Sequence, residues 1–125
     1  MLSEATIATL KASFRGALVE PGDARYDADR KVYNAMIDRR PRLIAHCADV
    51  ADVITAVNWG RENDVIISVR GGGHNAGGLG VADNALVIDL SGIKYVRVDP
   101  KKKTVLVGGG ALWADVDHEI GRAHV

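Results

Sequence analysis

The segment VIISVRGGGHNAGGLG, residues 65–80, joins a β-branched run to a loop in which six of the chain's 14 glycines fall between Gly71 and Gly80. The run of residues 65–70 is typical of a buried strand. Successive glycines allow several backbone N–H groups to turn toward one point, because no Cβ atoms interfere. The segment therefore predicts a strand that leads into a loop able to surround an anion such as a phosphate or a pyrophosphate.

Two common glycine-rich motifs are excluded by the residues that follow the loop. A Rossmann fingerprint opens directly into a helix, whereas residues 85–90 (ALVIDL) form a second strand-like run. A Walker P-loop needs Gly-Lys followed by Ser or Thr, and the sequence contains no such string. Two interpretations remain: a long loop that holds a pyrophosphate through its backbone amides, or a flexible glycine linker that binds nothing.

His74 is the one ionisable side chain in the middle of this loop. A neutral imidazole is nucleophilic near physiological pH, so His74 is either a nucleophile or a hydrogen-bonded bystander. Arg70, at the base of the loop, either adds positive charge to the anion site or forms an ion pair on the surface. Residues 108–110 (GGG) form a tight turn or approach the same ligand, and Trp113 either packs on a helix or contacts that ligand with its ring.

Apolar spacing predicts the elements that precede the loop. Ser3 is a candidate N-cap for a helix that ends at Pro21-Gly22-Asp23, and a short second helix is expected within residues 27–36. A strand over residues 42–47 follows, and Asp49 caps the next helix. The apolar faces of these three helices are expected to contain, in order, Ile7, Leu10, Phe14 and Leu18; Val32, Ala35 and Met36; and Val50, Val53, Ile54 and Val57.

The elements after the loop are a strand over residues 85–90 and a hairpin formed by residues 95–99 and 104–107, with the lysines 101–103 in its solvated turn. Leu112, Val116 and Ile120 mark a last amphipathic helix. Strand, helix and strand over residues 42–70 imply a right-handed parallel crossover. The predicted fold class is therefore α+β, with an α/β-like part: a small parallel βαβ unit that carries the long glycine-rich loop, followed by an antiparallel hairpin.

Composition excludes several partner classes. The 125 residues are 47% hydrophobic and 26% charged, which suits one globular domain, and 16 basic residues balance 16 acidic ones. This balance gives no reason to expect a nucleic acid or a membrane surface as a partner. The first 20 residues contain no apolar run typical of a signal peptide or a membrane span, so a cytoplasmic location is expected.

The cysteine and the other histidines do not predict a further site. Cys47 is the single cysteine, so an intrachain disulfide is excluded and a packed thiol is expected. His46 lies on a predicted strand, and His118 and His124 are six residues apart rather than the four that place two ligands on one helix face. No metal site is therefore predicted.

The segment RGGGHNAGGLG (70–80) and the later LVIDLSGIKYVRVDPKKKTVLVGGGALWADVD (86–117) resemble the FAD-binding domain of the vanillyl-alcohol-oxidase, or p-cresol-methylhydroxylase (PCMH), superfamily. The upstream segment YDADRKVYNAMIDRRPRLIAHCADVADVITAVNWGREND (26–64) is similar to the bacterial branch that resembles berberine-bridge enzyme. The resemblance extends from about Tyr26 to the end of the chain, and its combination of motifs is specific.

This resemblance implies that the glycine loop wraps the pyrophosphate of FAD. The residues implied as cofactor-binding are Arg70, Gly71, Gly72, Gly73, His74, Asn75, Gly77, Gly78 and Gly80. His74 matches the family histidine that bonds covalently to the methyl carbon of the flavin's benzenoid ring. The implied reaction removes a hydride from an alcohol or amine carbon of a small molecule, with dioxygen as the electron acceptor and hydrogen peroxide as the product.

Family members are several hundred residues long, so the resemblance implies that this chain is a fragment. Residues 1–25 are expected to form an N-terminal helical segment, and residues 26–125 half of a PCMH-type FAD-binding domain. The rest of that domain and the substrate domain, which supplies the catalytic base, are then missing, so no catalytic residue is predicted. Such a fragment is expected to bind FAD weakly and to turn over no substrate. The alternatives are an inactive remnant that has lost FAD and an anion-binding module without a redox role.

Overall fold

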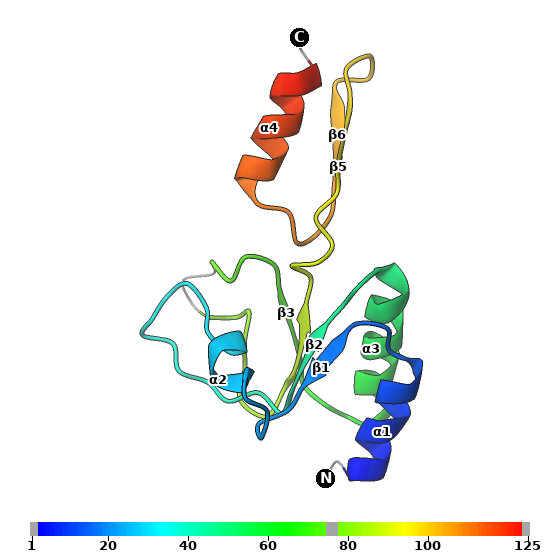
Figure 1. Cartoon of the computed structure of the whole chain (residues 1–125), viewed down its shortest axis with the longest axis vertical. Coiled ribbons are helices and arrows are strands. Elements are labelled where there is room, and N and C mark those ends of the chain that lie inside the picture. Colours follow the sequence, from blue (N-terminus) through cyan, green and yellow to red (C-terminus); the bar gives the residue numbers. More distant parts are fainter. Residues whose placement is uncertain (1–2, 75–77, 124–125) are drawn as a thin grey trace.

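The computed structural model describes residues 3–74 and 78–123, which form a sheet with helices on both faces and, beyond it, a hairpin with a helix (Figure 1). The elements in chain order are α1 (Glu4–Ser13), β1 (Ala17–Val19), α2 (Tyr26–Asp29), β2 (Leu43–His46), α3 (Val50–Glu62), β3 (Ile67–Arg70), β4 (Leu86–Asp89), β5 (Val96–Asp99), β6 (Thr104–Val107) and α4 (Trp113–Ala123). None of the helices in these two described ranges is long and apolar enough to cross a membrane.

The larger sheet has the strand order β1-β2-β4-β3. Strands β2, β4 and β3 run parallel, whereas β1 runs antiparallel to β2 at one edge. The expected α+β class and the parallel direction of β2 and β3 are therefore confirmed. The two strands are not neighbours, however, because β4 lies between them and pairs with both. The crossover through α3 consequently passes over the position of a third strand.

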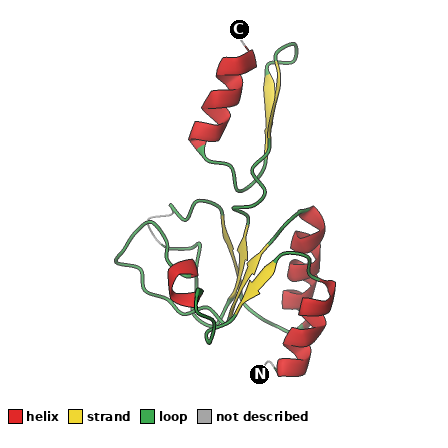
Figure 2. Cartoon of the chain, viewed as in Figure 1, coloured by secondary structure: helices red, strands yellow, loops and turns green. Residues whose placement is uncertain are grey.

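The core forms on both faces of this sheet because side chains alternate along its strands. Helices α1 and α3 cover one face, while α2 and the long loops cover the other (Figure 2). One buried cluster consists of Ile7, Leu10, Phe14, Leu43, Ala45, Cys47, Ala56, Trp59, Leu86 and Ile88. The opposite cluster consists of Val19, Tyr26, Ile44, Val81 and Val87. Cys47 is buried, which confirms the expected packed thiol, and this burial raises its pKa to about 12.

The first helix is shorter than predicted, because α1 ends at Ser13 and Leu18 lies in β1. The carboxylate of Asp52 on α3 accepts hydrogen bonds from the backbone N–H groups of Arg15 and Gly16, both at 2.8 Å. Gly16 also lies so close to β2 that a Cβ there would stand 1.9 Å from a backbone oxygen. These long-range contacts pull the chain out of the helix that its apolar spacing favours.

The second predicted helix is also mostly absent, since α2 has only four residues and residues 30–40 continue without a regular element. Helix α3 is confirmed, but only Val53 of its predicted apolar face packs against the core. Val50 and Ile54 are 58% and 57% exposed, whereas Ala56, Trp59 and Gly60 are buried. A Cβ at Gly60 would meet the side chain of Ile67 at 2.8 Å, so α3 turns its smallest residues toward the sheet.

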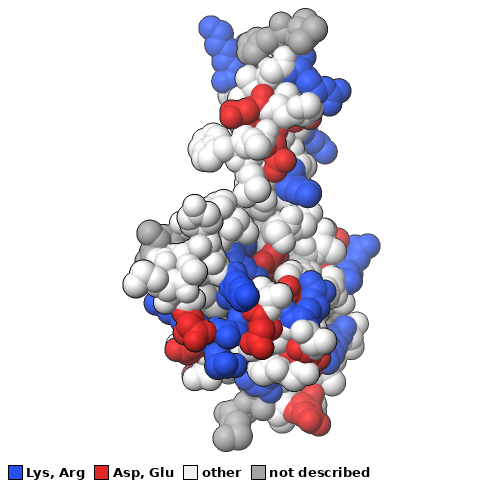
Figure 3. Space-filling model, turned by 60° about the vertical axis from the view of Figure 1, so that its left-hand side comes forward, with Lys and Arg blue, Asp and Glu red and all other residues white. Residues whose placement is uncertain are grey.

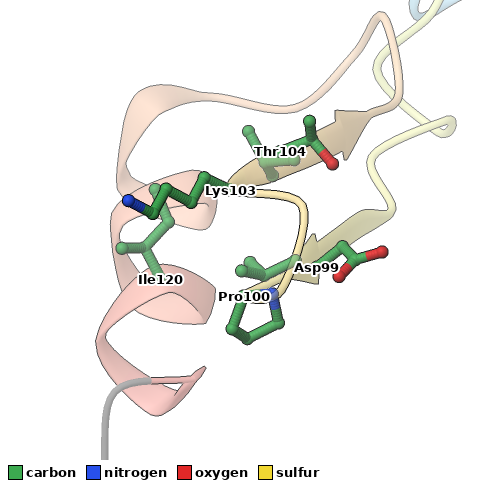
Figure 4. A pocket seen from close by; sticks show the side chains of 7 residues that line it. Asp99, Pro100, Lys103, Thr104 and Ile120 are labelled. Carbon is green, nitrogen blue, oxygen red and sulfur yellow. The ribbon is translucent and has the colours of Figure 1, made fainter.

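The hairpin and the last helix are confirmed as β5, β6 and α4. The lysines 101–103 are exposed in the turn, as expected, and Lys103 has a φ of 55°. Helix α4 packs along β5 and buries Val116. Figure 4 shows the side chain of Ile120 facing Pro100 and Lys103 across a shallow hollow of about 360 Å³.

Asp52 provides a test of this account of the N-terminal segment. An Asp52→Ala variant removes the acceptor of three backbone N–H groups, those of Arg15, Gly16 and Ala48. Because three part-buried hydrogen bonds and the buried carboxylate that accepts them are lost together, we expect the free energy of unfolding in urea to fall by about 3 kcal/mol. The exposed Asp117→Ala on α4 is the control and is expected to change it by less than about 0.5 kcal/mol.

The contribution of Asp52 is expected to depend on pH. Burial raises the pKa of its carboxyl, but the three backbone donors outweigh burial and hold the pKa below its ordinary value. The stability difference between wild type and Asp52→Ala should therefore be complete above about pH 4 and shrink as the pH falls below it. A difference that grows on acidification would contradict this assignment.

Candidate functional site

The two glycine-rich stretches meet where the sheet adjoins the hairpin and α4 (Figure 1). A Cβ added to Gly71 would stand 2.8 Å from the carbonyl oxygen of Gly109, and one added to Gly72 would stand 2.9 Å from Leu112 Cδ2. The two backbones therefore approach so closely that side chains at these positions would separate them. The proximity of the two stretches is a requirement of the interpretation that residues 108–110 approach the same ligand as the first loop, and that interpretation stays a prediction.

A cavity of about 610 Å³ opens between the two stretches. Its lining residues are Gly72, His74, Val107, Gly108, Gly109, Ala111, Leu112, Trp113 and Val116. Trp113 is 81% exposed, so the predicted packing of its ring on the helix is wrong, and the indole instead borders this cavity. The lining is mostly apolar side chains and backbone, which suits a flat aromatic group better than an ion.

A second hollow, of about 220 Å³, lies inside the curve of the first loop. It is lined by Val69, Arg70, Gly71, Gly72, Gly73, His74, Leu79 and Gly80. Gly73 has a φ of 73°, which reverses the backbone in a conformation that L-residues with a side chain rarely adopt. Because Gly72 and His74 border both spaces, a ligand with a polar part and an aromatic part could occupy the two together.

The backbone N–H groups of Gly71, Gly72, Gly73 and His74 are open to a ligand. No acceptor within residues 3–74 and 78–123 takes a hydrogen bond from any of these four donors. Buried or half-buried backbone donors are almost always paired in proteins. Gly71 is half-buried and Gly73 is buried, whereas Gly72 and His74 are exposed, so water can reach the N–H groups of these two. Four neighbouring N–H groups around one hollow resemble a backbone anion site.

The side chain of Arg70 lies at the base of the glycine loop and holds it through an ion pair and a hydrogen bond. Its Nε and Nη2 lie 2.8 and 2.7 Å from Asp89 Oδ2, and its Nη1 donates to the carbonyl oxygen of Lys31 at 3.3 Å. The Arg70 side chain is 6% exposed, so the predicted ion pair exists but lies in the interior and not on the surface. A Cβ at Gly80 would stand 3.5 Å from this side chain, which therefore fills the space beneath the loop.

Asp89 and His46 complete a row of charged side chains across the strand ends, and sequence reasoning did not identify either as part of the site. His46, Asp89 and Arg70 are the last residues of β2, β4 and β3, and they are in register. His46 Nδ1 lies 3.7 Å from Asp89 Oδ1, and His46 Nε2 lies 3.0 Å from Asp29 Oδ2. One feature of the sequence could have indicated this row: two apolar strands each end in a charged residue, β3 in Arg70 and β4 in Asp89.

The pKa values in this row follow from its geometry. Burial raises the pKa of Asp89, but His46, Ser91 and Arg70 together outweigh burial and hold it well below its usual range. The carboxylates of Asp89 and Asp29 raise the pKa of His46, although burial opposes them. The row is thus arranged to keep Asp89 ionised and to favour a protonated imidazole beside it.

The other predicted site residues are only partly gathered here. His74 is exposed and borders both hollows, and its ring contacts that of Tyr33 edge-on, with centroids 5.3 Å apart. Gly78 lies behind the loop, where a Cβ would meet the side chain of Ile37 at 2.9 Å. Asn75 and Gly77 lie outside the described residues.

Charge of neither sign dominates the face of the molecule shown in Figure 3. Basic and acidic side chains are mixed over the face shown in Figure 3. In the ranges 3–74 and 78–123, no group of three or more His, Cys, Asp or Glu side chains converges as a metal site would require.

Residues 41–125 match the protein family described as the FAD binding domain. Among curated proteins, (R)-6-hydroxynicotine oxidase of Paenarthrobacter nicotinovorans is 32% identical over 110 residues, which are 88% of this chain and 24% of that protein. The crystal structure of 6-hydroxy-D-nicotine oxidase from Arthrobacter nicotinovorans is similar with a TM-score of 0.84 at 30% identity, over 98% of this chain and 26% of that one.

A structure of a berberine-bridge-enzyme-like (BBE-like) protein, BBE-like 1 of Physcomitrella patens, is similar with a TM-score of 0.74 at 31% identity, over 84% of this chain and 23% of that one. The chain thus spans about a quarter of the length of the relatives that it matches.

A variant of His46 tests the charged row. His46→Gln keeps a polar side chain but cannot become charged. Since the pKa of His46 is raised in the folded chain, its stabilisation is complete below the unfolded value of about 6.5 and is lost as the pH rises through the folded value. We expect the difference in unfolding free energy between wild type and His46→Gln, measured in urea, to be larger at pH 5.5 than at pH 9. The control His118→Gln, exposed on α4, is expected to show no such trend.

Proposed function

The chain belongs to the FAD binding domain family, among the FAD-linked oxidoreductases of the vanillyl-alcohol-oxidase and BBE-like group, and from this we propose that its glycine loop holds the FAD pyrophosphate. The membership confirms the resemblance read from the sequence. The single observation that supports the proposed site is the set of four N–H donors at Gly71, Gly72, Gly73 and His74, which find no acceptor among the described residues 3–74 and 78–123. Backbone donors of this kind bind phosphate oxygens without a charged side chain.

The residues present fit this cofactor. A Cβ at Gly72 would stand 2.7 Å from the ring of His74, and one at Gly71 would press on the backbone of Gly109, so only glycine lets the loop pack this closely beside the two hollows. We assign the cradle to Arg70, Gly71, Gly72, Gly73, His74, Asn75, Gly77, Gly78 and Gly80. Within this set Arg70 acts from beneath, since its guanidinium is already bound to Asp89.

His74 is proposed as the covalent anchor of the flavin. Its imidazole is exposed at the boundary between the loop hollow and the larger cavity, with room on the cavity side. Joining an imidazole nitrogen to the methyl carbon of the flavin releases one proton from each partner and two electrons in total. Dioxygen, as the oxidant, takes up the two electrons and two protons to give hydrogen peroxide, so the attachment balances.

The larger protein of which this family domain is a part is proposed to oxidise a small molecule. When bound, FAD supplies the hydride-accepting chemistry, and the protein supplies binding, orientation and electrostatic tuning. We propose that the hydride leaves an alcohol or amine carbon and that dioxygen is the final acceptor; the relatives named as hydroxynicotine oxidases support an oxidase. The chain is about a quarter as long as these relatives. We propose that it binds FAD through residues 26–125 but turns over no substrate. Residues of α1 and β1 complete the hydrophobic core of the chain.

Gly71 tests the cradle. A Gly71→Ala variant places a methyl group 2.8 Å from the Gly109 carbonyl oxygen and has to push the two stretches apart. We expect the dissociation constant for FAD, measured by flavin fluorescence quenching, to rise at least tenfold. Gly22→Ala is the matched control, because a Cβ there meets nothing within 4 Å. Competition with ADP separates the cofactor from a general anion site, and equal affinity for ADP and FAD would exclude a role for the flavin ring.

His74 tests the anchor. Wild-type chain loaded with FAD under air is expected to keep yellow colour in the protein pellet after acid precipitation. His74→Ala is expected to bind FAD but release it into the supernatant on denaturation, whereas the control His118→Ala keeps it. Flavin that remains attached in His74→Ala would place the bond on another residue, and a wild-type chain that never binds FAD would support the inactive remnant.

A further inference from the structure

We propose that Tyr33 is a positioning residue, which holds the imidazole of His74 in the orientation needed for attachment to the flavin. This inference rests on the proposed role of His74. The two rings are 41 residues apart in sequence yet lie edge to face, with centroids 5.3 Å apart and an interplanar angle of 71°. This geometry is the favoured one for a pair of aromatic rings.

The contact is anchored through the backbone and does not depend on the exposed ring alone. The N–H of Tyr33 donates to the carbonyl oxygen of Gly73 at 2.8 Å. Two residues earlier, the carbonyl oxygen of Lys31 accepts a hydrogen bond from the buried Arg70. The irregular segment over residues 30–40 is therefore hydrogen-bonded to the glycine loop and its base through Lys31 and Tyr33, the two neighbours of Val32. These bonds position Tyr33 beside His74.

The imidazole is confined from a second direction as well. A Cβ on Gly72 would stand 2.7 Å from both Nδ1 and Cε1 of His74, so the ring folds back over that position. The same Cβ position would stand 2.9 Å from Leu112 Cδ2. With Tyr33 against one edge and the Gly72 backbone beneath, the ring keeps few of its rotamers while still bordering the cavity.

Restricting the imidazole matters for the proposed bond, because only one nitrogen in one orientation can reach a given carbon. A group held in the reactive orientation does not lose rotamer freedom during the reaction. Tyr33 is 79% exposed, a high value for a tyrosine ring that has only a packing role. Its position beside the proposed anchor gives this exposed ring a function in the attachment step. In that step the imidazole and the methyl carbon each lose a proton, and dioxygen takes up two electrons.

The test compares Tyr33→Leu, Tyr33→Phe and wild type in the 125-residue chain, with Met36→Ala as the control from the same segment, since Met36 is 91% exposed. Two readouts are needed. Nuclear Overhauser cross-peaks between the ring protons of residue 33 and those of His74 report the contact without any flavin. The rate at which acid-stable flavin accumulates under air, together with the dissociation constant for non-covalent FAD in a His74→Ala background, separates attachment from binding.

We expect the cross-peaks in wild type and Tyr33→Phe. Attachment in Tyr33→Leu is expected to be about two- to tenfold slower, the range that an aromatic pair of this kind contributes. Non-covalent FAD affinity is expected to change less than twofold, and Tyr33→Phe and Met36→Ala to attach flavin at the wild-type rate. A merely structural role would weaken binding and attachment together.

Three results would overturn the inference. Missing cross-peaks in wild type would remove the contact itself. Wild-type attachment rates in Tyr33→Leu, with wild type carrying covalent flavin, would reject the positioning role and leave the proposed function intact. A wild-type chain that binds FAD but never forms acid-stable flavin would reject both the anchor and its positioning.

Discussion

The buried ion pair between Arg70 and Asp89 is the interaction on which the rest of the structure depends. It joins the carboxyl ends of β3 and β4, and because β4 is flanked on its other side by β2, Asp89 also lies next to His46. Isolating charges from water is costly unless each lone pair and proton finds a partner. Here Asp89 Oδ2 faces Arg70 while Oδ1 accepts from the N–H and the hydroxyl of Ser91, so the carboxylate is well satisfied.

This arrangement explains how the glycine loop can keep its donors unpaired. A loop that binds a ligand through its backbone cannot be stabilised by those same N–H groups. The loop is held from outside instead: Arg70 lies beneath it, the N–H of Tyr33 takes the carbonyl oxygen of Gly73, and Gly71 packs against the second glycine stretch. These contacts use a carbonyl oxygen, close backbone packing and the Arg70 side chain. None of them uses the N–H groups of residues 71–74, which therefore remain available to a ligand.

Local sequence patterns predicted most strands and helices because their apolar periodicity is strong, and the glycine loop predicted both an anion site and the family. Contacts between distant residues could not be read in the same way. Strand β1 forms because Asp52 captures the backbone of residues 15 and 16, and nothing within residues 1–20 signals this. The insertion of β4 between β2 and β3 is a choice of strand order, which periodicity does not encode.

The same limit applied to side chains at the site. Residues of α3 were assigned to the core by hydrophobicity, whereas the structure buries Ala56, Trp59 and Gly60, and Gly60 is the residue that permits the close approach to Ile67. Asp89 was read as part of a strand because its partners, Arg70 and His46, are 19 and 43 residues away in sequence. His74 was identified because an ionisable residue among glycines is a local feature, and Tyr33 was not, because its contact with His74 exists only after folding.

The division of the molecule into a four-stranded sheet and a separate two-stranded hairpin has a consequence for its dynamics. Strand β4 is buried along its whole length, whereas all four residues of β6 are exposed. A two-stranded hairpin with one helix retains little cooperative stability of its own. Amide hydrogens in β5 and β6 are thus expected to exchange with solvent through local opening, well before those of β4, which exchange only when the whole sheet unfolds.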